Sequence, residues 1–301
     1  MSGLGGMVEF IAEPVLLPVV GATVLLLIPR MPWCVEPRRR VAAWTAPLTV
    51  TAVTALSLHA TESVGLWTFD QRWYGLLPAS AIVGVVSALG RGKLVVSATA
   101  AFLAILSLQF PGHDGIAFRA MIALVAGLLS IAIRHPMNRA PALTTIALGS
   151  AMLSLATMLA VIGSMKVALL ASALGATALA CGTFTWFGPG FTGGTAFATS
   201  MTTMSLAIAV YGSAYRGDSD HSTASFWFVA LSPLLMTVTT LSFSRSSRLG
   251  LLAGASFLCV IIVCAWSVIA CVQRQEAIDH RERLPYTRAD AILPRHRCAE
   301  V

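Results

Sequence analysis

The stretch GHDGIAFRAMIALVAGLLSIAIRHP, residues 112–136, holds Arg119 as the only charged side chain between Asp114 and Arg134. A helix needs about 20 mostly apolar residues to cross the hydrocarbon layer of a membrane, because that layer is about 30 Å thick. The stretch meets this length and is continuously apolar, unlike the alternating strands of a membrane barrel. It therefore predicts a membrane-spanning helix.

The composition extends this prediction to the whole chain. Of 301 residues, 56% are hydrophobic and 11% are charged, with a mean hydropathy of +0.79, whereas soluble domains carry about 25% charged residues. Uncharged windows cover residues 41–61, 141–165 and 167–215. Backbone polar groups find no water in lipid, so such windows are expected to form helices. The predicted fold is an all-α, polytopic integral membrane bundle.

The apolar windows predict about ten transmembrane helices within a transmembrane domain of residues 1–271. Prolines and glycines separate them, for example in PGHDG at 111–115. The expected spans are 10–28, 41–59, 76–90, 94–110, 115–133, 141–163, 167–186, 195–213, 225–243 and 249–271. Residues 272–301 mix six arginines with acidic residues and are expected to form a flexible polar tail.

Charge predicts the orientation of the bundle. Loops rich in lysine and arginine stay cytoplasmic, and one side of the predicted bundle collects the basic residues Arg30, Arg38, Arg39, Arg40, Arg91, Lys93, Arg134, Arg139, Arg245 and Arg248. This places the protein in the plasma (bacterial inner) membrane with the N-terminus outside, and ten spans return the C-terminus to the outside. A nine-span alternative makes 167–213 one crossing with a re-entrant half, which leaves the arginine-rich tail in the cytoplasm.

Arg119 is a candidate contact for a substrate or ion. A charge at the bilayer centre costs at least about 2.5–3.5 kcal/mol and usually has a function. Arg119 lies near the start of its span, however, so its side chain could simply reach the outer headgroups. His113 and Asp114 precede it and could form an outer cluster with it, and Asp70 is a further acidic candidate in an outer loop.

The segment FGPGFTGG, residues 187–194, has two interpretations. Gly188, Pro189, Gly190, Gly193 and Gly194 could form a tight turn between two spans, or they could form a re-entrant or gating loop.

No pattern in the chain indicates catalysis. Phosphate loops, dinucleotide fingerprints, zinc-protease motifs and nucleophile elbows are all missing from the sequence, and the six cysteines show no C-x-x-C spacing. We therefore expect no enzyme activity, no metal and no cofactor. The net charge of +7 follows from the basic loops and tail, so no nucleic-acid partner is expected.

Small residues are frequent in the predicted spans, especially at 147–157, at 168–182 and in the Gly250–Gly254 spacing. Such residues let helices approach closely, within one chain, with a second copy or with other membrane subunits. The expected partners are thus the lipid bilayer and other membrane proteins. The hydroxyl-rich run TSMTTMS at 199–205 could hydrogen-bond across helices or line a path for a neutral solute.

Three consecutive segments resemble the opening of the antiporter-like subunits of complex I, membrane-bound hydrogenases and Mrp antiporters. They are LPVVGATVLLLIPRMP (17–32), RRRVAAWTAPLTVTAVTALSL (38–58) and LWTFDQRWYGLLPAS (66–80), and the likeness covers about residues 14–90. It implies an ion-translocating bundle in which Asp70 matches the family's aspartate-bearing segment. The family also carries glutamate and lysine at mid-membrane, and this sequence has neither within its predicted spans.

Two classes of function follow. The first is a transporter or translocation-associated subunit for a small solute or ion. The second is a non-catalytic subunit that scaffolds a membrane protein complex. A bundle of about ten spans is typical of transporters, which favours the first class by analogy of fold alone.

Overall fold

The computed structural model describes residues 19–20, 76–89, 93–108, 115–187, 194–215, 220–242 and 249–292. The predicted spans 10–28 and 41–59 lie outside these ranges, apart from the helical residues Val19 and Val20. The described residues form helices joined by short turns, without a strand among them. The all-α class is therefore confirmed for this part of the chain.

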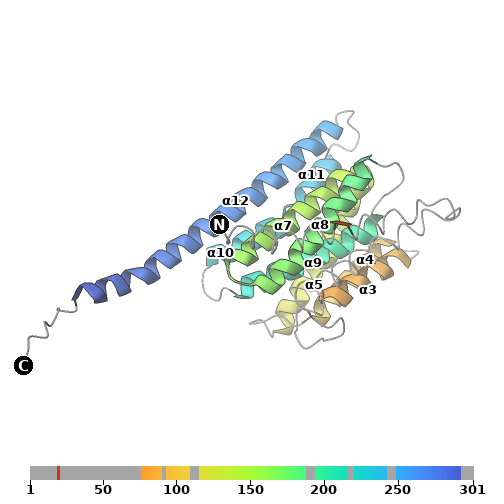
Figure 1. The fold of residues 1–301 in the computed structure, drawn as a ribbon. Helices are drawn as coiled ribbons and strands as arrows, with labels where there is room; N and C mark the ends of the chain where they lie inside the picture. Colours follow the sequence, from red (N-terminus) through yellow and green to blue (C-terminus); the bar gives the residue numbers. More distant parts are fainter. Residues whose placement is uncertain are drawn as a thin grey trace, which may run out of the picture.

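The structure describes the following helices, in chain order (Figure 1). They are α3 (Leu76–Leu89), α4 (Lys93–Ser107), α5 (Ile116–Ala132), α6 (Arg134–Arg139), α7 (Pro141–Val161), α8 (Met165–Phe187), α9 (Gly194–Tyr215), α10 (Asp220–Leu231), α11 (Leu234–Ser242) and α12 (Leu249–Ile292).

Among the described residues, four helical segments are long and apolar enough to cross a membrane: Ile116–Arg139, Pro141–Val161, Val167–Trp186 and Leu251–Ala277. The pair α10–α11 passes the same test only when it is taken as one bent span, and α4 is a shorter apolar helix. Many large apolar side chains on the outer helices are exposed, including Leu258, Ile262 and Trp266 of α12. Such a surface suits a lipid environment.

Helix α9 occupies the centre of the bundle. Every residue from 196 to 212 is buried, because α3, α4, α5, α6, α7, α8 and α10 all contact this helix. A helix that is buried on all sides needs no polar face, yet α9 carries the hydroxyl-rich run 199–205. The run therefore lies in the interior and not at the lipid surface.

Helices α7 and α8 form the most closely packed pair. The chain reverses between them at Gly163, whose φ of 85° lies in the left-handed region that favours glycine. A Cβ added at Gly149 would lie 3.0 Å from the Gly175 carbonyl oxygen and 3.0 Å from the Leu179 backbone nitrogen. The close approach of these two backbones thus depends on glycine, as the small-residue segments 147–157 and 168–182 predict.

Helix α12 is much longer than the predicted span 249–271. It continues to Ile292 and projects away from the bundle as the blue helix in Figure 1. No glycine or proline interrupts the chain between Gly254 and Pro285, and the first polar residues beyond 272 are glutamine, arginine and glutamate, which favour helix. Most of the segment 272–301, expected as a flexible tail, is therefore a continuation of the helix.

Candidate functional site at a broken helix

The predicted span 225–243 is not one continuous helix, which corrects the expectation from the sequence. It is broken at Ser232 and Pro233, and its two halves, Ala224–Leu231 and Leu234–Leu241, meet at an angle of 44°. Pro233 has no backbone N–H and cannot continue the regular hydrogen-bond ladder. The break therefore has a local cause in the sequence.

Hydrogen bonds across the break are of the tighter three-residue kind. The backbone N–H of Ser232 donates to the Val229 oxygen at 3.2 Å, and that of Leu235 donates to the Ser232 oxygen at 3.0 Å. The Leu231 carbonyl thereby loses the N–H of Leu235, which a regular α-helix would supply. The Ser232 hydroxyl donates to the Val229 oxygen at 2.8 Å and replaces the donor that Pro233 lacks.

Side chains from two other helices meet the break. The Ser232 oxygen lies 3.7 Å from the sulfur of Cys264 on α12, and the hydroxyl of Ser154 on α7 interacts with the same thiol. Ser232 and Cys264 are only 4% and 3% exposed. We refer to Ser154, Ser232 and Cys264 as the mid-span polar cluster.

The cluster lies deep in the bundle. Ser154, Ser232 and Cys264 each fall near the middle of an apolar segment of membrane-spanning length, namely Pro141–Val161, the α10–α11 pair and Leu251–Ala277. Hydroxyl and thiol groups can both donate and accept hydrogen bonds. Together with the Leu231 carbonyl, they could hold a small uncharged hydrogen-bonding solute or contribute oxygen ligands to a monovalent cation.

The second half of the broken helix, α11, is attached to its neighbours by polar contacts. Thr237 of α11 donates to the Ala132 oxygen at 3.3 Å, and Nε2 of His135 donates to the Thr240 oxygen at 3.2 Å. The Ser256 hydroxyl of α12 lies 2.6 Å from that of Thr239. Because α11 is held on both sides, any change in the bend angle must move α10 or the neighbours of α11.

The hydroxyls of α9 are mostly satisfied within their own helix. Thr202 donates to the Ala198 oxygen at 2.8 Å, and Thr203 donates to the Thr199 oxygen at 2.7 Å. Threonines in membrane helices commonly bond back in this way. These two side chains therefore face a buried surface with their donors occupied. The same holds for Ser154 and Ser232, whose hydroxyls donate to the Ser150 oxygen at 2.9 Å and the Val229 oxygen at 2.8 Å.

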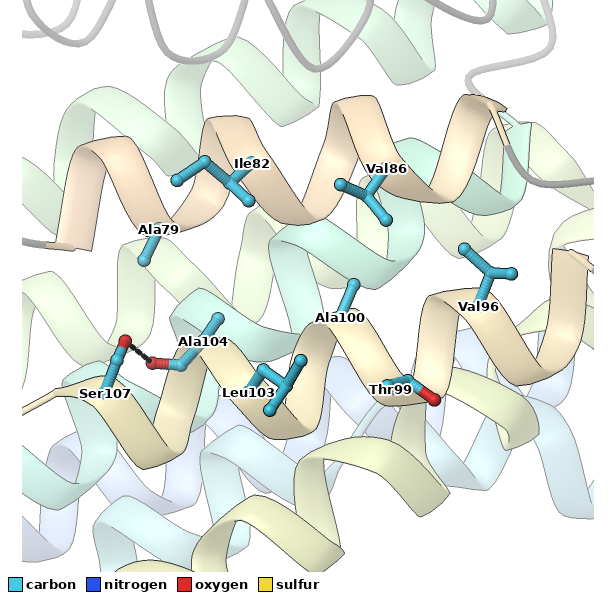
Figure 2. Close-up of a pocket in the computed structure, with 9 residues that line it drawn as sticks. All are labelled: Ala79, Ile82, Val86, Val96, Thr99, Ala100, Leu103, Ala104 and Ser107. Atoms are coloured by element: carbon cyan, nitrogen blue, oxygen red, sulfur yellow. Dashed lines mark hydrogen bonds between the residues drawn. The ribbon is translucent and has the colours of Figure 1, made fainter.

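A groove of about 350 Å³ lies between α3 and α4 (Figure 2). Its lining is almost wholly apolar and includes Ile82 and Leu103, which are 60% and 57% exposed. A second groove of about 250 Å³ separates α4 from α5. Both open at the outer surface of the bundle, and Thr99 and Ser107 are the polar side chains among their lining residues.

Two of the predicted site residues fall within the described ranges. Arg119 lies in the first turn of α5, where its backbone N–H donates to the Gly115 oxygen at 3.2 Å, and its side chain is half-buried. Gly194 begins α9 with a φ of 67°. The other candidates, Asp70, His113, Asp114, Gly188, Pro189, Gly190 and Gly193, lie outside the described residues.

The sequence analysis missed the mid-span polar cluster, although one signal for it was present. Pro233 follows Ser232 in the middle of an apolar run, and a proline there predicts a kink or a break. The pairing of Ser232 with Cys264 has no such local signal. Among the described residues, no group of three or more His, Cys, Asp or Glu could hold a metal ion.

No protein-family model matches the chain, and no curated protein has a matching sequence.

Proposed function

We propose that the protein is a transporter, or a translocation-associated subunit, whose solute binds at the α10–α11 break. The supporting observation is the interruption of a membrane-spanning helix at mid-depth, beside Ser154 and Cys264. Irregular backbone is tolerated at membrane depth only where protein or a polar cavity surrounds it. Many transporters use such discontinuous helices to hold their substrate near the membrane midplane.

The composition of the described helices favours an uncharged solute or a monovalent cation over a proton. From α3 to α11, every Asp, Glu or Lys lies in the first turn of its helix: Lys93, Lys166 and Asp220. Proton relays in membranes use titratable side chains at depth. The resemblance to antiporter-like subunits would then concern the arrangement of the N-terminal spans and not the pumping residues.

The topology that we propose has about ten spans in the plasma membrane, with the N-terminus outside. Support comes from the apolar windows and from the basic residues of the inner loops. A reporter fused after Val301 should then be non-cytoplasmic, whereas one inserted at Arg139 should be cytoplasmic. A cytoplasmic signal at both places would replace the proposal with the nine-span arrangement.

The test of transport uses the complete chain in detergent and a fixed panel of alkali-metal chlorides, glycerol, urea, sugars and neutral amino acids. A solute that binds the native state raises the unfolding midpoint, and the rise grows with the logarithm of the ratio of solute concentration to Kd. We expect at least one member of the panel to do so for the wild type. The same solute should then accumulate in proteoliposomes that contain the protein.

Two variants link that response to the break. Pro233→Ala restores a backbone N–H and should abolish the solute response without lowering the unfolding midpoint. Ser130→Ala removes a hydroxyl that bonds to the Ala126 oxygen at 2.8 Å, and it should leave the response unchanged. An equal response in wild type and Pro233→Ala would remove the break as the binding point.

An accessory subunit is the second candidate, and the projecting half of α12 favours it. Such a helix reaches beyond the bundle and offers a surface to other membrane subunits or to a second copy of the chain. Mild detergent extraction would then yield stable co-purifying chains, and no solute in the panel would raise the unfolding midpoint. That combined result would contradict transport.

A further inference from the structure

Most buried hydroxyls in the described helices donate to a carbonyl of their own helix. Ser130 bonds to the Ala126 oxygen and Thr177 to the Ala173 oxygen, both at 2.8 Å. Within the described residues, three buried hydroxyls have no hydrogen-bond partner, and they belong to Ser87, Ser97 and Ser205. Their side chains are 0%, 3% and 1% exposed.

The three exceptions lie on helices that contact one another, because α3, α4 and α9 touch in every pairing. Such an orphaned group carries a desolvation cost of roughly 1–3 kcal/mol when nothing binds it. Serine in a membrane helix can usually avoid this cost by bonding back to its own backbone. The three unpaired hydroxyls are therefore found on three helices that pack against one another.

The groove between α3 and α4 shows how two of these serines are aligned. The helices run antiparallel, with Ala79 beside Ser107 at one end and Val86 near Val96 at the other (Figure 2). Ser87 and Ser97 each follow one of these valines, so they lie within about one helical turn of the same level.

Both serines are turned away from the groove. A step of one residue rotates a side chain by about 100° around the helix axis, which moves Ser87 and Ser97 off the groove lining and toward the interior. There they continue the buried rows that contain Val83 on α3 and Ala101 on α4, each 0% exposed. The interior side of this pair is the side on which α9 lies.

We propose that Ser87 and Ser97 form a binding site for a water molecule between the α3–α4 pair and α9. A buried water typically makes two to four hydrogen bonds to polar groups that lack other partners. Two hydroxyls supply two of these bonds, and Ser205 on α9 is the third candidate partner. The neighbouring buried side chains Val83 and Ala101 are apolar and uncharged, which favours water over an ion.

This site is separate from the α10–α11 break. Its residues belong to α3 and α4, and neither helix is part of the mid-span polar cluster. The proposal therefore does not depend on transport, and failure of the solute test would leave it intact.

The first test measures the sign of a stability change in the double variant Ser87→Ala, Ser97→Ala. If the hydroxyls bind water, their removal deprives the water of two hydrogen-bond partners. The unfolding midpoint in lipid nanodiscs should then fall by roughly 2–4 °C. If the hydroxyls are dry and unpaired, alanine removes a desolvation cost and the midpoint should rise. An unchanged or raised midpoint would overturn the proposal.

The second test detects the water itself by brief X-ray radiolysis, in which bound water yields hydroxyl radicals that label contacting side chains. Labelling of the α4 peptide should be present in the wild type and lost in the double variant. Ser130→Ala is the matched control, because its hydroxyl is buried but already bonded within α5. It should retain the wild-type labelling, and equal labelling in the wild type and the double variant would overturn the water site.

Discussion

The α7–α8 hairpin and the α10–α11 helix are both built from apolar residues, but they are held in the bundle by different contacts. In α7–α8, two continuous helices lie close together because Gly149 and Gly175 leave room for the backbones. In α10–α11, Pro233 interrupts the helix and polar side chains join it to its neighbours. One region is fixed by contact between backbones, and the other by a few hydrogen bonds.

The two regions are therefore expected to differ in how easily their helices move relative to one another. Packed backbones cannot slide without overlap, since protein interiors are close-packed. Interhelical hydrogen bonds in membranes are individually weak, about 0.6 kcal/mol on average, and can exchange partners. We therefore expect the α7–α8 hairpin to act as the rigid framework against which the α10–α11 break can change its angle.

The largest effect is expected for Gly149→Ala, which tests the close packing of the α7–α8 hairpin. The added Cβ would lie 3.0 Å from two backbone atoms of α8, so the helices must separate, at a cost of about 1–3 kcal/mol. Thermal unfolding of the purified protein measures this loss.

Gly254→Ala is the matched control for that experiment, because no atom lies within 4 Å of its added Cβ. Alanine is a better helix former than glycine, so this variant should gain roughly 0.5–1 kcal/mol. Changes of the same sign in both variants would contradict the contrast between a packed and an open helix face.

Ser232→Ala tests the hydrogen bonds at the α10–α11 break. The variant loses the hydroxyl bond to the Val229 oxygen and the contact with Cys264, which should cost about 0.5–1.5 kcal/mol. A double-mutant cycle with Cys264→Ala should give a coupling of roughly 0.6 kcal/mol. A cycle of Cys264→Ala with Ser130→Ala should give none, and equal couplings in the two cycles would mean that the Ser232–Cys264 contact has no specific role.

The smallest effect is expected at Arg119, outside both regions. Its place in the first turn of α5 lets a long cationic side chain reach the headgroups, and lysine has the same reach. Arg119→Lys should therefore change stability by less than about 0.5 kcal/mol, and Arg119→Leu should still insert normally. Lost function in both variants at normal membrane abundance would instead assign Arg119 a contact through its planar guanidinium.

Within the residues that the structure describes, the positions of several helices could be predicted from the sequence, because a long apolar run has few alternatives to a helix. The predicted span 141–163 differs by two residues at one end from helix α7, Pro141–Val161. The predicted span 195–213 lies within helix α9, Gly194–Tyr215. The break was missed because apolar residues flank Pro233 on both sides and hide its effect in a hydropathy window. The continuation of α12 was missed because charge density was given more weight than helix propensity.

The contacts between helices could not be predicted in the same way. In a membrane, the lipid and the protein interior are both apolar, so a helix such as α7 shows no polar face that would fix its rotation. Whether Ser154 faces Cys264 or the lipid depends on that rotation. The meeting of Ser154, Ser232 and Cys264 therefore required the three-dimensional arrangement, and so did the alignment of Ser87 with Ser97.

The length of α12 has a geometric consequence for any motion at the break. Cys264 touches Ser232 near the middle of the bundle, and the same unbroken helix ends at Ile292. The distance between the two positions is about 42 Å along the helix axis. A tilt of about 10° at Cys264 would move the far end of a straight helix by about 7 Å. A small rearrangement inside the bundle would therefore give a large displacement outside it. A spin label beside Ile292 would record that displacement as a change in distance to a second label on α7.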